Sequence, residues 1–195
     1  MNIIRHRLVE AQQIESPNYN ERPPGQQPEL MVVHSISLPP GQYGGPYIEQ
    51  LFTNQLSPQD HPYFQEIHPL QVSAHLLIRR DGSLMQFVPF DKRAWHAGKS
   101  NYQGRENCND FSIGIELEGT DDSAFEAVQY QVLAHVIRCL LDTYPSLSER
   151  DITGHSDIAP GRKTDPGTGF DWALLHRLVA GKSPPPPVPG KGSSA

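Results

Sequence analysis

The segment ITGHSDIAPGRKTDPGTG, residues 152–169, is the stretch around which the rest of the chain is predicted to fold. Its prolines and glycines exclude a continuous helix and a central strand, so we expect a loop of fixed shape. Within it His155 and Asp165 are ten positions apart, and Lys163 lies between them. Such a loop can direct three polar side chains to one point, but an ordinary surface loop with incidental charges explains the segment equally well when it is taken alone.

The composition indicates one domain and limits its partners. A chain of 195 residues with 36% hydrophobic residues can form one core but hardly two. Its net charge of -6 provides no basic surface for nucleic acid or anionic lipid. No apolar run approaches the roughly 18 residues needed to cross a bilayer, and the first residues do not resemble a signal peptide, so we expect a cytoplasmic protein. The two cysteines, Cys108 and Cys139, are expected to be reduced thiols.

Three segments upstream of this loop have the patterns of β-strands. Residues 30–33 form a short apolar run that ends at His34. Residues 72–89 consist of two β-rich runs joined through an Asp-Gly turn, which predicts a hairpin. Residues 111–118 alternate between apolar side chains and small or acidic ones, which predicts a strand with two different faces.

Two helices are predicted from apolar residues at helical spacing. The first covers 123–143, begins with a capping box of Ser123 and Glu126, and should cover the sheet. His135 lies off its apolar stripe and is expected to be exposed. The second helix, over 171–179, closes the domain.

Four side chains upstream of residue 152 could take part in chemistry, three on these strands and Trp95 in the loop that follows the hairpin. His34, at a strand end, is on general grounds more often a hydrogen-bonded structural residue than a ligand. Glu116 would be costly to bury in a central strand unless a cation lay beside it, and on an edge strand it would simply be solvated. His75, in the hairpin, is predicted to be a core histidine or an outer partner of a metal ligand. Trp95 could anchor a lid or form a platform for a sugar or peptide.

The two imidazoles and one carboxylate of His34, His155 and Asp165 form a suitable ligand set for zinc. Three protein ligands leave a fourth position open, as in catalytic zinc sites that lower the pKa of a bound water toward ~7 and favour hydrolysis. Hydrolysis of an amide also needs a proton shuttle, which Glu116 could provide. A positive charge near the developing oxyanion could come from Lys163.

Five motifs in order along the chain carry a family resemblance. They are VVHSISLPPG (32–41), VSAHLLIRRDG (72–82), RAWHAG (93–98), NDFSIGIELEGT (109–120) and GHSDIAPGRKTDPG (154–167). Together they resemble the N-acetylmuramoyl-L-alanine amidases of the AmpD type, which are related to peptidoglycan recognition proteins. The resemblance extends from about Ser16 to Leu178, and five ordered motifs at compatible spacing are far more specific than any one of them.

The resemblance implies a single α/β domain with a mixed central β-sheet flanked by helices. It implies one Zn²⁺ ion held by His34, His155 and Asp165, with Glu116 and Lys163 as catalytic residues. The substrate-binding residues that we expect are Ser35, Tyr63, His75, Trp95, Asn107 and Arg162. Cytosolic members of the family cleave the bond between the lactyl group of 1,6-anhydro-N-acetylmuramic acid and L-Ala during cell-wall recycling, and so influence β-lactamase induction. We therefore expect an anhydro-muropeptide substrate, no nucleic-acid or membrane partner, and a monomer.

Four positions depart from the family pattern. Ser35 replaces the usual Asn, Gln71 and Asn107 replace Arg, and Ser156 replaces Cys. None of these belongs to the predicted chemistry. The two missing arginines would weaken recognition of stem-peptide carboxylates, because neutral amides cannot replace bidentate binding by a guanidinium.

The chain divides into three predicted parts. Residues 1–28 are expected to be a coil that wraps the surface, 29–180 the zinc amidase domain, and 181–195 a disordered tail rich in Pro, Gly and Ser. Two other functions remain open at this stage. One is a non-catalytic module that binds peptidoglycan fragments, and the other is a zinc peptidase of ordinary peptides, which would use similar groups.

Overall fold

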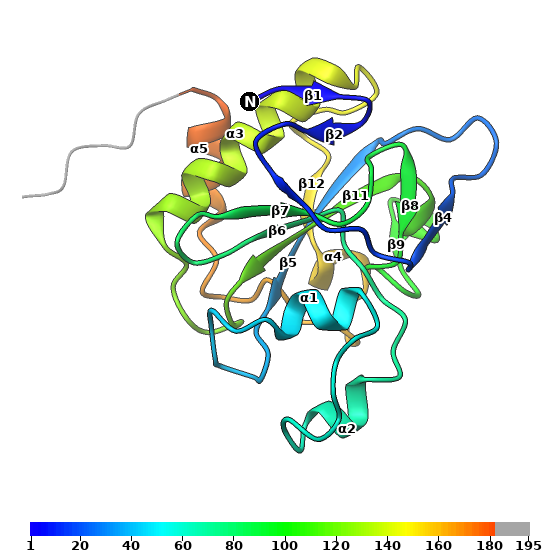
Figure 1. Ribbon diagram of the computed structural model, residues 1–195. Helices are drawn as coiled ribbons and strands as arrows, with labels where there is room; N and C mark the ends of the chain where they lie inside the picture. The colour runs from blue at the N-terminus through cyan, green and yellow to red at the C-terminus, as the bar shows by residue number, and fades with distance from the viewer. Residues whose placement is uncertain (182–195) are drawn as a thin grey trace, which may run out of the picture.

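A computed structural model describes residues 1–181, and Figure 1 shows them as an α/β domain around a mixed sheet. The sheet has six strands in the order β12-β5-β11-β6-β7-β3. Their bounds are β3 (Gln12–Gln13), β5 (Leu30–Ile36), β6 (Leu76–Ile78), β7 (Leu84–Gln86), β11 (Ser112–Glu118) and β12 (Ile152–Gly154). β12, β5, β11 and β6 run parallel, whereas β7 is antiparallel to β6 as the predicted hairpin requires. The predicted α/β class with a mixed sheet is confirmed.

Shorter elements surround this sheet. Three two-stranded sheets pair β1 (Ile3–Ile4) with β2 (Arg7–Leu8), β4 (Tyr19–Glu21) with β8 (Lys92–Ala94), and β9 (Asn101–Tyr102) with β10 (Arg105–Glu106). The helices are α1 (Tyr47–Phe52), α2 (Phe64–Ile67), α3 (Ala127–Thr143), α4 (His155–Ile158) and α5 (Trp172–Val179), with a 3-10 helix at Cys108–Asp110. Within residues 1–181, no helix has both the length and the apolar character needed to cross a membrane.

The alternation of residues along β5 and β11 gives the sheet one apolar face and one face that is polar along β11. Met31 and Val33 of β5 pack in one core cluster with the apolar residues of β11 and with the helices α3 and α5. Figure 1 shows these two helices together on one side of the sheet. The opposite face of β11 carries only Ser112, Gly114 and two glutamates. Because small and polar side chains leave space there, that face can hold a site.

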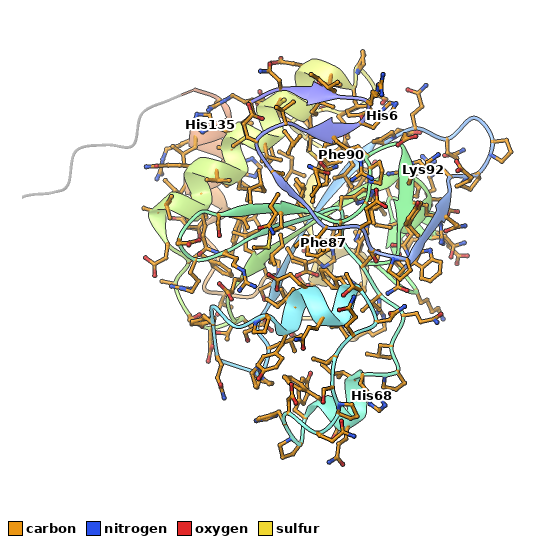
Figure 2. All side chains as sticks on the ribbon, in the orientation of Figure 1. His6, His68, Phe87, Phe90, Lys92 and His135 are labelled. Atoms are coloured by element: carbon orange, nitrogen blue, oxygen red, sulfur yellow. The ribbon has the colours of Figure 1, made fainter. Side chains whose placement is uncertain are left out.

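α3 begins later than predicted because its capping residues differ. The backbone N–H of Glu126 donates to the side-chain Oε1 of Gln129 at 3.0 Å, so the capping box starts at Glu126 and not at Ser123. His135 is exposed as predicted, and Figure 2 shows it on the outer side of α3. The closing helix is confirmed as α5, and its first turn is capped by Asp171, whose carboxylate accepts from the Leu174 backbone N–H at 2.8 Å.

The N-terminal segment differs most from its prediction. We predicted a coil on the surface for residues 1–28, but four short strands form there, and β3 extends the central sheet beside β7. Leu8, Ser16, Asn18 and Arg22 are buried. The abundance of Pro, Gln and Asn hid these strands, because each is too short for a visible alternation. Of the predicted tail at 181–195, only Gly181 lies within the described residues.

Candidate metal centre and active site

His34, His155 and Asp165 converge at one edge of the sheet. His34 lies inside β5, two residues before its end, and His155 is the first residue after β12. Because β12 and β5 are parallel neighbours, their carboxyl ends bring both imidazoles to the same edge. The Nδ1 atoms of the two histidines are 3.0 Å apart, and Asp165 Oδ2 is 3.0 Å from His34 Nδ1 and 3.1 Å from His155 Nδ1.

This donor set fits a small divalent ion. Zinc binds nitrogen and oxygen ligands at about 2.0–2.2 Å in tetrahedral geometry, which requires ligand atoms a little over 3 Å apart. The three atoms have nearly this spacing, and they form a group with metal-ligand geometry among the described residues. A proton on one Nδ1 could satisfy one pair of these atoms by a hydrogen bond to Asp165, whereas a divalent cation would satisfy all three at once. The three residues therefore form a candidate metal site.

Both imidazoles have outer partners that direct their Nδ1 atoms to this point. His155 Nε2 donates to the backbone carbonyl of Ala97 at 3.1 Å. His34 Nε2 lies 2.9 Å from His96 Nδ1, and His96 Nε2 lies 3.1 Å from the hydroxyl of Ser112. Hydrogen on both Nε2 atoms leaves the Nδ1 lone pairs free for a metal, which is the usual role of such partners.

The sequence pattern does not predict the contact of His96 with His34. Its ring lies over Gly114 of β11, where an added Cβ would be 2.4 Å from His96 Cγ. The sequence feature that could have indicated this contact is Gly114, because a glycine inside a regular strand often marks the close approach of another group. Pattern alone could not reveal that the ring covering Gly114 belongs to the motif RAWHAG.

The loop that carries Asp165 is fixed by packing against a neighbouring loop. The backbone carbonyl of Asp165 accepts from the Ser156 N–H at 2.9 Å, which connects the loop to the first turn of α4. Farther along, the Gly169 N–H donates to the carbonyl of Asp121 at 2.8 Å. Gly167 has a φ of +81° and its Cα lies so close to Asp121 that a Cβ would be 2.2 Å from the Asp121 backbone.

Gly167→Ala is therefore expected to destabilise the domain. A left-handed backbone costs an alanine about 1 kcal/mol or more, and the overlap with Asp121 adds about 1–3 kcal/mol. Gly161→Ala is the matched control, because Gly161 has a similar φ of +75° in the same loop but open space around it. Urea unfolding of both variants measures the difference. Equal losses would contradict the importance of the contact with Asp121.

A cavity of about 710 Å³ opens over the candidate metal centre. Its polar side includes the three predicted ligands and Glu116, Lys163 and Asp121, and its apolar side is formed by Leu38, Leu51, Ile67 and Val72. Lys163 is exposed in the loop, and its backbone N–H donates to the Ala159 carbonyl at 3.1 Å. It is the one Lys or Arg among the cavity-lining residues in the described part of the chain.

Glu116 stands directly opposite His34 in the pairing of β11 with β5. The side chain is buried, and its Oε2 atom has no hydrogen-bond partner within residues 1–181. Burial raises the pKa of Glu116 well above its usual range, the charge of Asp165 raises it further, and Lys163 lowers it in part. A carboxyl group with a raised pKa in a cavity beside a metal site is suited to accept and return a proton.

Comparison with known proteins agrees with this geometry. The sequence model of the N-acetylmuramoyl-L-alanine amidase family matches residues 24–168. The chain belongs to this family. It is 62% identical over 173 residues to the 1,6-anhydro-N-acetylmuramyl-L-alanine amidase AmpD of Escherichia coli, which covers 89% of this chain and 94% of that relative.

Solved structures agree with the fold of this amidase. A crystal structure of a selenomethionine derivative of AmpD matches with a TM-score of 0.90 and 58% identity, over 92% of this chain and 99% of that one. A second structure is the complex of the amidase AmiD from E. coli with anhydro-N-acetylmuramic acid-L-Ala-D-γ-Glu-L-Lys. It matches with a TM-score of 0.56 and 27% identity, over 83% of this chain and 65% of that one.

The amidase brings together some of the predicted substrate-binding residues but not others. Ser35, Tyr63 and Trp95 line the cavity over the metal centre. Asn107 and Arg162 line a separate surface depression of about 660 Å³, and the Arg162 guanidinium donates to the backbone carbonyls of Ala97 and Lys99 at 2.6 Å.

His75 also lies outside the main cavity. It is fully buried, its Nδ1 accepts from the Gly114 N–H at 3.0 Å, and its Nε2 lies 3.0 Å from the Lys92 carbonyl. Burial, together with the charge of Arg22, lowers the pKa of His75 to about 3. Of the two predictions for His75, the structure agrees with the core histidine, because both ring nitrogens have hydrogen-bond partners.

Proposed function

We propose that this amidase hydrolyses the bond between the lactyl group of 1,6-anhydro-N-acetylmuramic acid and L-Ala of the stem peptide, with one Zn²⁺ ion. One observation carries the proposal: the cavity that contains the His34, His155 and Asp165 triangle also contains the buried, unpartnered carboxyl of Glu116. The names of the AmpD relatives and the substrate in the AmiD complex support the choice of an anhydro-muropeptide.

The residues of the cavity divide the chemistry among them. Zinc, when bound, would polarise the scissile carbonyl and make a nucleophile available at neutral pH. Glu116 takes up the proton of the attacking water on its free Oε2 and passes it to the leaving amine of L-Ala. Lys163 supplies a positive charge at the rim, where the oxyanion develops. The apolar side of the cavity excludes water from the rest of the substrate.

The charge balance of the cavity supports a modest affinity for the stem peptide's carboxylates. Lys163 lines the cavity together with four acidic residues, Glu116, Asp121, Asp122 and Asp165. Neither Gln71 nor Asn107, where the family pattern has Arg, lines this cavity, and both are neutral. We propose that recognition relies mainly on the sugar and on the backbone of the peptide.

Mass spectrometry can separate this proposal from its rivals. The protein is incubated with anhydro-muropeptide, intact wall polymer or free stem peptide, each with and without a chelator. Release of free stem peptide from the anhydro-muropeptide, abolished by the chelator, is the expected result. Binding of the muropeptide without any cleavage would favour a binding module, and cleavage within the free stem peptide would favour a peptidase.

Lys163→Ala is expected to lower kcat with little change in zinc content. The charge is needed mainly when the tetrahedral intermediate forms, and the loss of one such donor typically costs about 10²- to 10³-fold. Lys163→Arg should recover only part of the rate, because a planar guanidinium differs in shape from an ammonium group. Steady-state kinetics on the anhydro-muropeptide measure both variants.

The matched control for Lys163 is Lys99→Ala, which removes another exposed lysine outside the main cavity. It should leave kcat and KM near the wild-type values. A change in KM alone for Lys163→Ala would contradict the role, since that pattern marks uniform substrate binding.

The cellular role follows from the same reaction. We propose a monomer that acts in the cytoplasm during peptidoglycan recycling and, by removing anhydro-muropeptides, influences β-lactamase induction. Cell fractionation and light scattering test the location and the oligomeric state. Deletion of the gene should raise the level of anhydro-muropeptides and alter inducible β-lactamase activity.

A further inference from the structure

One short loop contacts both histidine ligands of the candidate metal centre. This is the loop 94–98. His96 Nδ1 lies 2.9 Å from His34 Nε2. The backbone carbonyl of the next residue, Ala97, accepts a hydrogen bond from His155 Nε2 at 3.1 Å. Two adjacent residues therefore orient two ligands that are 121 positions apart in the sequence. A small shift of this loop would misdirect both Nδ1 atoms.

The side chain of Asn109 holds this loop in place. Its Oδ1 accepts from the backbone N–H of His96 at 3.1 Å and from that of Ala97 at 2.8 Å. Asn109 is buried in the 3-10 helix that leads into β11, so its carboxamide has little freedom to move. One oxygen atom thus fixes both residues that contact the ligands.

The backbone around Asn109 is itself anchored. The buried guanidinium of Arg22 donates to the carbonyl of Asn109 at 3.2 Å, to that of Asp110 at 3.0 Å and to that of Ser112 at 2.9 Å. The absence of a side chain at Gly114 leaves room for the His96 ring on the other side. The position of Asn109 is therefore determined by the core and not by the metal.

We propose that Asn109 is a positioning residue of the metal centre, which sets the orientation of both histidine ligands through the N–H groups of His96 and Ala97. This inference rests on the proposed zinc function. The carboxamide touches neither the metal ligands nor the cavity, so its effect passes entirely through the loop. A purely structural asparagine would contribute to folding stability without any effect on the metal.

Asn109→Ala is the first test, with zinc affinity as the readout. Loss of the shared acceptor leaves two N–H groups without their partner and allows the loop to move. We expect zinc affinity, measured by competition with a chromophoric chelator, to fall by up to the roughly 10- to 100-fold that the loss of a direct partner of a metal ligand costs, because Asn109 acts on both ligands through the loop. The absorption spectrum of the cobalt-substituted protein should change as well, because it reports the coordination geometry.

Two variants provide matched controls. Asn109→Asp keeps an oxygen that accepts both N–H groups, so it should retain the zinc affinity of the wild type within a few-fold. Asn18→Ala removes another buried asparagine that fixes loops, because its amide donates to the carbonyl of Val72 and to Asn54 Oδ1, both at 2.8 Å. Asn18→Ala should lower the melting temperature and leave the zinc affinity and the cobalt spectrum unchanged.

A second measurement needs no variant and covers the case in which Asn109→Ala does not fold. In the zinc-loaded wild-type protein, NMR should show slowly exchanging Nε2 protons on both His34 and His155, since each is hydrogen-bonded to the loop. Rapid exchange of either proton would overturn the inference. The inference would also be overturned if Asn109→Ala folded and bound zinc as tightly as Asn18→Ala. Failure of the wild type to bind zinc at all would instead overturn the proposed function.

Discussion

Glu116→Gln is expected to keep its zinc and to lose about 10²- to 10⁴-fold in kcat, the range typical of a general acid-base group. Glutamine has nearly the same shape as glutamate, but its amide cannot accept a proton from water and return it to the amine. Within residues 1–181 the buried Oε2 of Glu116 has no hydrogen-bond partner, and such a group costs stability, so its presence in the cavity is best explained by a role in the reaction. Turnover per zinc-loaded molecule, with zinc counted by elemental analysis, is the measurement.

Glu118→Gln is the matched control for this prediction. Glu118 lies on the same face of the same strand, but its Oε1 accepts from Arg79 at 2.8 Å and from the Gly44 N–H at 2.7 Å, and its Oε2 from the Arg80 N–H at 3.2 Å. Its replacement should lower stability and leave the kcat of the folded protein near that of the wild type. Near-normal turnover in zinc-loaded Glu116→Gln would show that another group is the base. That group would have to line the cavity, which excludes His75.

The two seven-residue strands at the centre of the sheet, β5 and β11, could be predicted because they are long enough to show their pattern, and β6 and β7 because a turn signal joins them. The alternation over 111–118 and the hairpin over 72–89 both correspond to observed strands. Burial in β11, however, does not alternate, since all seven residues are buried. The sequence could not show that Glu116 and Glu118, on the polar face, would be covered by loops from elsewhere in the chain.

The convergence of His34, His155 and Asp165 could be predicted because five ordered motifs, and not the residue types alone, pointed to it. The residues that hold the ligands in place could not be predicted, because such contacts depend on how loops pack. Asn109 lies in a polar segment with no periodicity, and only the structure brings its side chain to the backbone of His96 and Ala97. For the same reason Asn107 and Arg162 could not be placed: nothing in their local sequence shows that they face a different depression.

Replacement of any one metal ligand, in His34→Ala, His155→Ala or Asp165→Ala, is expected to remove bound zinc and abolish hydrolysis. Zinc affinity should fall by more than the roughly 10- to 100-fold that is typical when a hydrogen-bond partner of a ligand is replaced, because here a direct bond to the ion is lost. The domain should remain folded, since none of the three residues belongs to the apolar clusters of the core. Elemental analysis and circular dichroism measure the two outcomes.

The thermal response to zinc tests the same prediction more sharply. Zinc that binds only the folded state should raise the melting temperature of the wild-type protein. In the metal-free state these groups are connected only by the hydrogen bonds between Asp165 Oδ2 and the two Nδ1 atoms, so removal of one of them should cost the metal-free protein much less than the loss of zinc costs the loaded protein. His135→Ala, which removes an exposed histidine on α3, should keep the full zinc-dependent rise. If a ligand variant bound one zinc per chain and showed the same rise in melting temperature, the replaced residue would not be a zinc ligand.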